Sequence, residues 1–539
     1  LSGKFNNYYF YEGMGCPIRS EIWAMVNPGN PDAAVRFAEI DGTLDHAGNS
    51  VWAEIFLAAL ESLCFTNDNL HENILQALTY VTEDCKFLRC VKMVIDEYNK
   101  GTSFEDIPRN TQIDYAHPDF TNSVQNLGYM VLALLFGERD IEKTINYALY
   151  CGYDADCTCA SAAAVIGILE GYSRIPDDLK QLLNDRYVCG IDVVRRDDKI
   201  SSLAEDTCRV GLSLCREFGL STIDLDNCHK DIELLKWEKP KKSVEITVDY
   251  ENQPGLGINL DCPVKVHIHN LSSGQIKGVL SFQNLPDGFN ISRNDITVDI
   301  PPNQTADVSV TISASESLQE FAQTNIVVAR LQSEDGIVLG EYSFGVIGAV
   351  VWNIYGPFIE QRYFEVDPNL PHCHGGESNL PPVESMFANM ALPDKEYLDE
   401  ERMLKDAESF KVTRVINSVD DIIDIDNSFG IKGEAVFYAA TDIVFDEDIT
   451  KWVVCGNSDA YKLWINGELI QNFDEFRNWQ PQTHGSLVQF KKGTNRVVVK
   501  LVRRAETLRF TFGLRDFTTR HYHGERWSID YRSRRISSK

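Results

Sequence analysis

The sequence predicts a multidomain α plus β protein, in which one all-α helical domain precedes two β-sandwich domains. Three observations support this prediction. Apolar residues recur at helical spacing up to about residue 230, a Lys/Pro-rich stretch follows at 236–243, and apolar and polar residues alternate after it. We place the domains at 1–235, 243–347 and 349–539. A chain of 539 residues is long enough for about three domains, each with its own core.

Five segments of the first domain have helical periodicity, with Gly and Pro at their ends. They are VWAEIFLAALESLCF (51–65), LHENILQALTYV (70–81), NLGYMVLALLFG (126–137), IEKTINYALYCG (141–152) and the small-residue run at 160–171. The last run contains one charged residue, Glu170. It therefore predicts a buried helix that packs closely against its neighbours.

Short alternating segments separated by turn residues follow the Lys/Pro-rich stretch. VKVHIHN (264–270) and ADVSVTISA (306–314) are typical of an Ig-like β-sandwich of about 100 residues. A third region opens near VVWNIYGPF (351–358) with an irregular segment, and its later part alternates again. There Asn466-Gly467 predicts a hairpin turn. The third region is therefore predicted to be a second β-sandwich.

Charge and composition exclude several classes of partner. A net charge of −29 excludes nucleic acid, because a phosphate backbone would be repelled. No apolar run approaches the roughly 20 residues of a membrane span, and no signal pattern follows Leu1, so we expect a soluble chain without a membrane partner. The 14 cysteines are scattered, which favours reduced thiols and a cytoplasmic location. Secretion and homo-oligomerisation stay open; secretion would allow glycosylation at three sequons, Asn270, Asn290 and Asn303.

Two aspartates, Asp154 and Asp156, stand two residues apart in GYDADC, at the start of the small-residue helix. One interpretation is helix capping, because the helix dipole and the free N–H groups favour carboxylates there. A cap needs only one acid, however, and alternate residues of an extended segment share a face. Two converging carboxylates are typical of a site for Mg²⁺ or Ca²⁺. Spacing alone leaves both interpretations open.

Three stretches carry a family resemblance: GMGCPIRSEIWAMVNPGNPDAAVRFAEIDGTLDHAGNSVWAEIFLAAL (13–60), NLGYMVLALLFGERDIEKTINYALYCGYDADCTCASAAAVIGILEG (126–171) and IP (175–176). Residues 1 to about 200 resemble the later part of the ADP-ribosylglycohydrolase family, whose all-helical fold holds a pair of Mg²⁺ ions. GYDADC resembles the family's metal segment, Gly-Gly/Trp-Asp-Thr-Asp-Thr/Cys-Asn. The resemblance implies that Asp154 and Asp156 are catalytic metal ligands. Cys157 would contribute only its backbone carbonyl, because a neutral thiol is a poor Mg²⁺ ligand.

Two further positions match the family's substrate-binding region. Arg19 aligns with the Arg of an Ala-Met-Arg or Gln-Ile-Arg segment, so it would meet a substrate phosphate or brace a carboxylate. The alternative is a structural ion pair with Asp41 or Asp45. His46 aligns with the His of a Ser/Thr-His pair. An interior histidine with satisfied hydrogen bonds is the favoured alternative to a base, since a metal-activated water does not need one.

Three polar residues complete the candidate site. Asn49 and Glu54 lie at or near the start of one predicted helix and could line the pocket, and each also has a capping or surface interpretation. Asn126 matches an Asn that related sequences place before a Leu-Leu-x-Gly segment. We include Asn49 and Asn126 among the substrate-binding candidates, with Asn126 expected behind the residues that touch the substrate.

The chain departs from the family in one respect. The family's first metal half-site, a Thr-Asp-Asp or Asp-Asp-Asp segment, precedes the Arg-containing stretch, whereas this sequence begins shortly before Arg19. Either an upstream segment is absent or the catalytic centre is lost, and the difficulty of deleting the first helices of a bundle favours absence. We expect these residues alone to hold at most one weakly bound cation and to show no hydrolysis. If these residues alone did hydrolyse substrate, Glu54, Asp41 and Asp45 would be the first candidates to replace the missing metal ligands.

The last domain resembles galactose-binding-like sandwiches, which often bind sugars through aromatic side chains. Four aromatics are candidates, although the core interpretation is favoured for each: Trp452, Tyr461, Trp464 and Trp479. HCHGG (372–376) is a weak zinc motif because no second ligand pair accompanies it.

The leading hypothesis is a glycohydrolase with Mg²⁺, two ions in an intact site, in which metal-activated water cleaves an N- or O-glycosidic bond of an ADP-ribosyl or carbohydrate substrate. The alternative is a pseudo-enzyme that serves as a structural, carbohydrate-binding or protein-binding scaffold.

Overall fold

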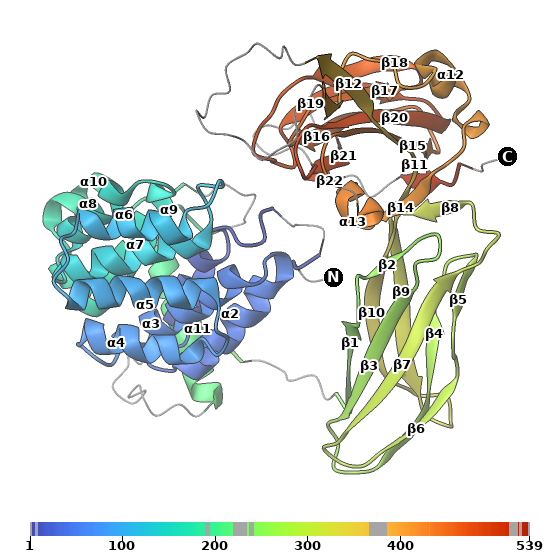
Figure 1. The fold of residues 1–539 in the computed structure, drawn as a ribbon. Coiled ribbons are helices and arrows are strands. Elements are labelled where there is room, and N and C mark those ends of the chain that lie inside the picture. The colour runs from blue at the N-terminus through green and yellow to red at the C-terminus, as the bar shows by residue number, and fades with distance from the viewer. Residues whose placement is uncertain are drawn as a thin grey trace, which may run out of the picture. The chain divides into compact units, whose positions relative to one another are not determined.

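The computed structural model describes residues 3–5, 9–188, 195–218, 234–236, 242–365, 385–430, 432–516, 526–527 and 531–536. They belong to two compact units, Leu1–Pro240 and Lys241–Lys539 (Figure 1). The first unit is helical and the second consists of β-sheets with a few short helices. The predicted α plus β fold class is therefore confirmed.

The helical unit contains helices of very different length and burial. They are α1 (Ser20–Met25), α2 (Pro31–Asp45), α3 (Asn49–Cys64), α4 (Leu70–Ala77), α5 (Lys86–Asn99), α6 (Asp106–Tyr115), α7 (Ser123–Phe136), α8 (Ile141–Cys151), α9 (Ala155–Glu170), α10 (Asp177–Leu183) and α11 (Ile200–Phe218), with short 3-10 turns η1 (Pro17–Arg19), η2 (Leu78–Tyr80) and η3 (Tyr172–Arg174). All five predicted helices are present.

Helices α3 and α7 form the centre of this unit. Nearly every side chain of both helices is buried, and both pack against α5 and α9 as well as against each other. Their sequences are apolar on almost every side, as expected of a helix surrounded by protein. The helix predicted after Asp156 is α9, which packs against α3, α7 and α8 but is buried along one face only, at six of its sixteen residues.

The first β-sandwich lies at the start of the second unit. One sheet has the order β1 (Val244–Tyr250), β3 (Cys262–Asn270), β7 (Thr305–Ala314), β5 (Phe289–Ile291). The other has the order β2 (Gly255–Leu256), β10 (Val338–Gly348), β9 (Thr324–Gln332), β4 (Ile276–Gln283), β6 (Ile296–Ile300). Buried and partly exposed residues alternate strictly along β3, because one face meets the core and the other meets solvent.

The second β-sandwich follows directly. Its larger sheet has the order β14 (Arg414–Ser418), β11 (Val350–Phe358), β15 (Ala435–Phe445), β20 (Gly493–Arg503), β17 (Tyr461–Ile465), β18 (Glu468–Phe473). The facing sheet has the order β19 (His484–Phe490), β16 (Ile449–Asn457), β21 (Phe510–Asp516), β22 (Arg526–Trp527), and β12 (Glu360–Glu365) pairs with β13 (Ser385–Met390). The Asn466-Gly467 turn has positive φ at both residues, 51° and 83°, as a tight hairpin requires.

Strand β15 differs from the alternating pattern because all its residues are buried. One face contributes Phe437 and Ala439 to the core between the sheets. The other face carries Val436 and Tyr438, which pack with Met403 of the short helix α12 (Glu400–Lys405) and with its neighbours. A strand covered on both sides needs apolar residues on both faces, which hides the alternation in its sequence.

The two sandwiches contact each other within their common unit. The Asn417 side chain accepts a hydrogen bond from Ile258 N at 2.8 Å and donates one to Ile258 O at 2.9 Å. In addition, β23 (Arg532–Arg534) pairs with β15 of the second sandwich and with β8 (Glu320–Ala322) of the first.

Several sequence features have a defined place in this fold. Tyr461 and Trp464 are buried in two cores of the last sandwich. Asn270 is fully buried with its side chain hydrogen-bonded to Ile300 O and Gly274 O, whereas Asn290 and Asn303 are exposed. The described cysteines are all free. No helix in the described ranges is long and apolar enough to cross a membrane. HCHGG lies outside the described residues.

We expect limited proteolysis to cut the chain first within 236–243, of which 237–241 lie outside the described residues. The reason is its Lys/Pro-rich sequence, typical of a linker, at the boundary between the two units. N-terminal sequencing of the fragments identifies the site. Early cleavage inside either unit, or failure of Ser243–Lys539 to fold when expressed alone, would contradict the boundary.

Candidate functional site

The start of α9 brings three potential metal ligands together. A carboxylate oxygen of Asp154, one of Asp156 and the Cys157 Sγ atom all lie within 4.8 Å of one another. Asp154 is only 6% exposed and occupies the N-cap position, yet its side chain accepts no capping hydrogen bond from a backbone N–H of the first turn. In contrast, Asn69, Asn122 and Asp140 cap α4, α7 and α8 through their side chains. Asp154 therefore does not act as a side-chain cap.

The electrostatics of this acid cluster suit a cation. Burial raises the pKa of Asp154, and the neighbouring Asp156 carboxylate raises it further. Burial also raises the pKa of the Cys157 thiol to about 12, with a further contribution from the Asp154 charge. At neutral pH the cluster thus presents two hard oxygen ligands and a protonated thiol. Hard oxygen ligands fit Mg²⁺ or Ca²⁺, and an ion between the carboxylates would relieve their repulsion.

Asn126 of α7 holds the backbone behind this cluster. Its side-chain oxygen accepts a hydrogen bond from Asp154 N at 3.2 Å, and its amide nitrogen donates to Phe120 O and Asn122 O, both at 2.8 Å. Asn126 is fully buried. Its side-chain oxygen and nitrogen are therefore engaged by the backbone of Asp154 and of the segment before α7.

Asp119 is an additional acidic residue that the sequence did not single out. It is 7% exposed, and its charge contributes to the raised pKa of Asp154. Its carboxylate accepts hydrogen bonds from Thr121 N and Oγ1 at 3.0 and 2.9 Å, which shapes the loop before α7. The Asp-Phe-Thr order resembles an ordinary turn, so only the fold reveals that this acid lies near the cluster.

Arg19 forms both of the ion pairs considered from the sequence. Its Nε lies 2.9 Å from Asp41 Oδ2, and its terminal nitrogens donate to Asp45 at 2.8 and 3.0 Å. The guanidinium is therefore occupied by α2 carboxylates.

His46 also pairs with Asp45. Its Nδ1 atom lies 2.7 Å from Asp45 Oδ1, and the residue is 9% exposed. The imidazole edge with Nε2 faces Gly15, where a Cβ atom would lie 3.3 Å away.

Asn49 and Glu54 of α3 each make contacts within the protein. Asn49 donates to Glu12 Oε1 at 2.7 Å and accepts from Phe87 N at 2.9 Å, which joins α3 to the start of α5. Glu54 is fully buried and accepts a hydrogen bond from the Cys16 thiol at 2.7 Å. Across the described ranges, Asp154, Asp156 and Cys157 are the one group arranged to hold a metal.

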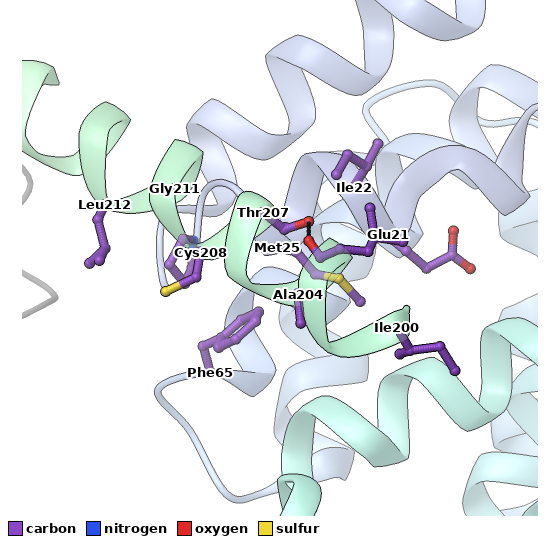
Figure 2. Close-up of a pocket in the computed structure, with 12 residues that line it drawn as sticks. Glu21, Ile22, Met25, Phe65, Ile200, Ala204, Thr207, Cys208, Gly211 and Leu212 are labelled. Atoms are coloured by element: carbon purple, nitrogen blue, oxygen red, sulfur yellow. Dashed lines mark hydrogen bonds between the residues drawn. The ribbon is translucent and has the colours of Figure 1, made fainter. Parts of the chain in front are cut away.

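A separate apolar groove lies between α1 and α11 and has a volume of about 660 Å³. Figure 2 shows Ala204 of α11 beside Met25 of α1. The lining also includes Phe65, Leu203 and Leu212, with few polar groups. Glu21 lines it as well, and its carboxylate accepts a hydrogen bond from Ser161 of α9 at 2.9 Å. The groove supplies apolar surface and no set of metal ligands.

Comparison with known families agrees with the helical fold. The sequence profile described as ADP-ribosylglycohydrolase matches residues 2–216. The helical domain is similar to the ADP-ribosylglycohydrolase family over these residues. This ADP-ribosylglycohydrolase domain includes the acid cluster, which makes Asp154, Asp156 and Cys157 the candidate site of a metal-dependent family. No curated relative matches the sequence.

Solved structures resemble parts of the chain only weakly. A FixG-related protein from Vibrio parahaemolyticus is 10% identical over 20% of this chain and 97% of its own, with a TM-score of 0.17. A β-glucosidase from Kluyveromyces marxianus is 15% identical over 20% of this chain and 14% of its own, also with a TM-score of 0.17. An α-L-rhamnosidase from Dictyoglumus thermophilum is 10% identical over 50% and 27%, with the same TM-score. Such scores do not establish a shared fold, so function is argued from the acid cluster.

Proposed function

We propose that the protein is a Mg²⁺-dependent glycohydrolase whose metal is held by Asp154 and Asp156. The observation that supports this most strongly is the convergence of the two carboxylates beside Cys157 in an ADP-ribosylglycohydrolase domain. The Asp154 side chain caps no helix, which leaves its oxygens available to an ion. Two acids fill part of a six-oxygen shell, and water or further oxygen ligands complete it.

The surrounding residues prepare this site. Asn126 fixes the backbone of Asp154, and the Cys157 thiol stays protonated, which makes its sulfur a poor ligand for Mg²⁺. Bound Mg²⁺ would supply Lewis acidity, the chemistry that activates a water for glycosidic cleavage. His46 is held through Nδ1 by Asp45, and its Nε2 faces Gly15. Asp45 also holds Arg19, and Glu12 holds Asn49.

The substrate class follows from the helical domain and its attached sandwiches. The family domain favours an ADP-ribosyl group linked through an N- or O-glycosidic bond. Attached β-sandwiches make a carbohydrate glycoside the competing substrate. The test uses the product of the complete gene with ADP-ribosylated protein and aryl glycosides, each with a Mg²⁺ titration and after chelation. Release of ADP-ribose or of the aryl group that requires the metal supports the proposal. No turnover of either substrate class would favour the scaffold alternative.

The last sandwich is proposed to bind neutral sugars. The segment between β18 and β19 carries Phe476, which is 71% exposed, together with the partly exposed Trp479. Exposed aromatic rings stack on sugar faces, and the acidic chain disfavours polyanions. We expect a glycan array probed with the whole chain to show neutral-glycan binding that falls at least about tenfold in Phe476→Ala. A Leu469→Ala variant, altered at an exposed aliphatic residue of β18, serves as the control. An array without hits would assign the sandwich a structural role.

A further inference from the structure

The turn before the acid cluster has an unusual backbone. Gly152 and Tyr153 both have positive φ, 71° and 60°, immediately before Asp154. Glycine adopts this conformation freely, whereas a bulky side chain is strained in it. In the described part of the chain, Tyr153 is the one aromatic residue with positive φ, and the other non-glycine cases are Glu138, Arg139, Asn184, Asp185, Asn259, Asn284, Asp295, Asn303 and Asn466. A residue keeps a strained conformation only where contacts with the surrounding structure stabilise it, so Tyr153 must have such contacts.

Helix α7 holds this turn at two points. The Tyr153 ring packs on the Tyr129 ring, with centroids 5.7 Å apart and planes inclined at 38°. Tyr129 is fully buried, so it provides a fixed surface, whereas Tyr153 is 37% exposed. Three residues before Tyr129, on the same face of α7, the Asn126 oxygen accepts the hydrogen bond from Asp154 N. The ring and the backbone of the turn are thus attached to neighbouring positions of one helix.

We propose that Tyr153 is a positioning residue for the metal site, whose ring anchors the left-handed turn so that the Asp154 carboxylate meets Asp156. The inference rests on the metal site of the proposed function. Asp154 directly follows the strained residue, and its side chain makes no capping bond to the backbone of α9. The turn therefore helps to set the direction of its carboxylate. A looser turn would let the two like-charged carboxylates move apart.

The direct test measures metal affinity in three variants of the complete gene product. Binding of Mn²⁺ alone, followed by electron paramagnetic resonance, is compared for wild type, Tyr153→Phe, Tyr153→Ala and Tyr153→Gly. Tyr153→Phe keeps the ring and should bind Mn²⁺ within about twofold of wild type. Tyr153→Ala and Tyr153→Gly lose the anchor and should bind it about tenfold or more weakly, the size typical of residues that orient ligands.

Thermal unfolding separates this role from general stabilisation. Tyr153→Gly relieves the strained φ and should unfold at a higher temperature than Tyr153→Ala, yet bind Mn²⁺ as weakly. Tyr172→Ala removes an exposed ring from η3, which follows α9, and should leave Mn²⁺ affinity unchanged. If affinity follows unfolding temperature across the variants, or does not change in any of them, the inference is overturned.

The outcomes also distinguish this inference from the proposed function. Metal-dependent hydrolysis by wild type, together with equal Mn²⁺ affinity in every Tyr153 variant, overturns the positioning role and leaves the glycohydrolase intact. Mn²⁺ binding that depends on the ring, in a protein that hydrolyses neither substrate class, supports the positioning role and overturns the reaction. A wild type that binds no Mn²⁺ overturns both.

Discussion

Asp154→Asn and Asp156→Asn should each reduce Mg²⁺-dependent hydrolysis by at least about a hundredfold and weaken metal binding by at least about tenfold. Each substitution removes the negative charge of one of the two carboxylates that converge beside Cys157, while the amide oxygen keeps the side-chain shape. Turnover of the substrate identified for the complete gene product and calorimetric titration with Mg²⁺ provide the two measurements.

The fold should survive both substitutions. Asp154 makes no side-chain cap, and its carboxylate and that of Asp156 repel each other when no ion is present. Neither Asn variant should therefore unfold at a lower temperature than wild type in metal-free buffer. Asp178→Asn, which alters an exposed acid at the start of α10, is the matched control and should change neither activity nor affinity. Full activity in both cluster variants would remove the metal hypothesis.

The long helices could be predicted from the sequence, because the same apolar residues produce both the helical pattern and the burial of the helix. Apolar residues on every side of 126–137 indicate a helix surrounded by protein, and α7 is the centre of its unit. Strand β15 shows the opposite case. Its second face is covered by residues around Met403, about thirty positions earlier in the chain, and no local pattern reports that contact.

The candidate site was predictable where the ligands are neighbours in sequence. Asp154, Asp156 and Cys157 come from one turn, so their spacing already placed them together. For Arg19 the sequence does not decide between a substrate contact and an ion pair. The choice depends on whether α2 packs against η1, and residue spacing does not reveal that packing. The positive φ of Tyr153 gave no signal either, since left-handed conformations are expected at Gly, Asn or Asp and not at an aromatic residue.

The second large expected effect is on stability: the free energy of unfolding should depend on pH through the buried Glu54 carboxyl. Burial, together with the nearby Asp41 carboxylate, raises the pKa of this carboxyl from 4.5 to about 8, against the lowering effects of the Cys16 thiol and Arg19. A raised pKa means that the folded protein holds a proton which the unfolded chain releases. The stability contributed by protonated Glu54 is therefore complete below about pH 4.5 and is lost as the pH rises to about 8.

Glu54→Gln should remove this dependence, because the amide is neutral at every pH and can still accept from Cys16 and donate to Asp41. In metal-free buffer the variant should gain stability over wild type as the pH rises from 5 to 8, by up to about 1.4 kcal/mol per pH unit, and the difference should level off at higher pH. Urea unfolding at several pH values gives the difference, with Glu39→Gln on the exposed face of α2 as the control. A constant difference between pH 5 and 8 would show that Glu54 ionises at its ordinary pKa. Its buried oxygen without a partner would then have to be solvated, and the contact with Cys16 would be looser than the 2.7 Å separation indicates.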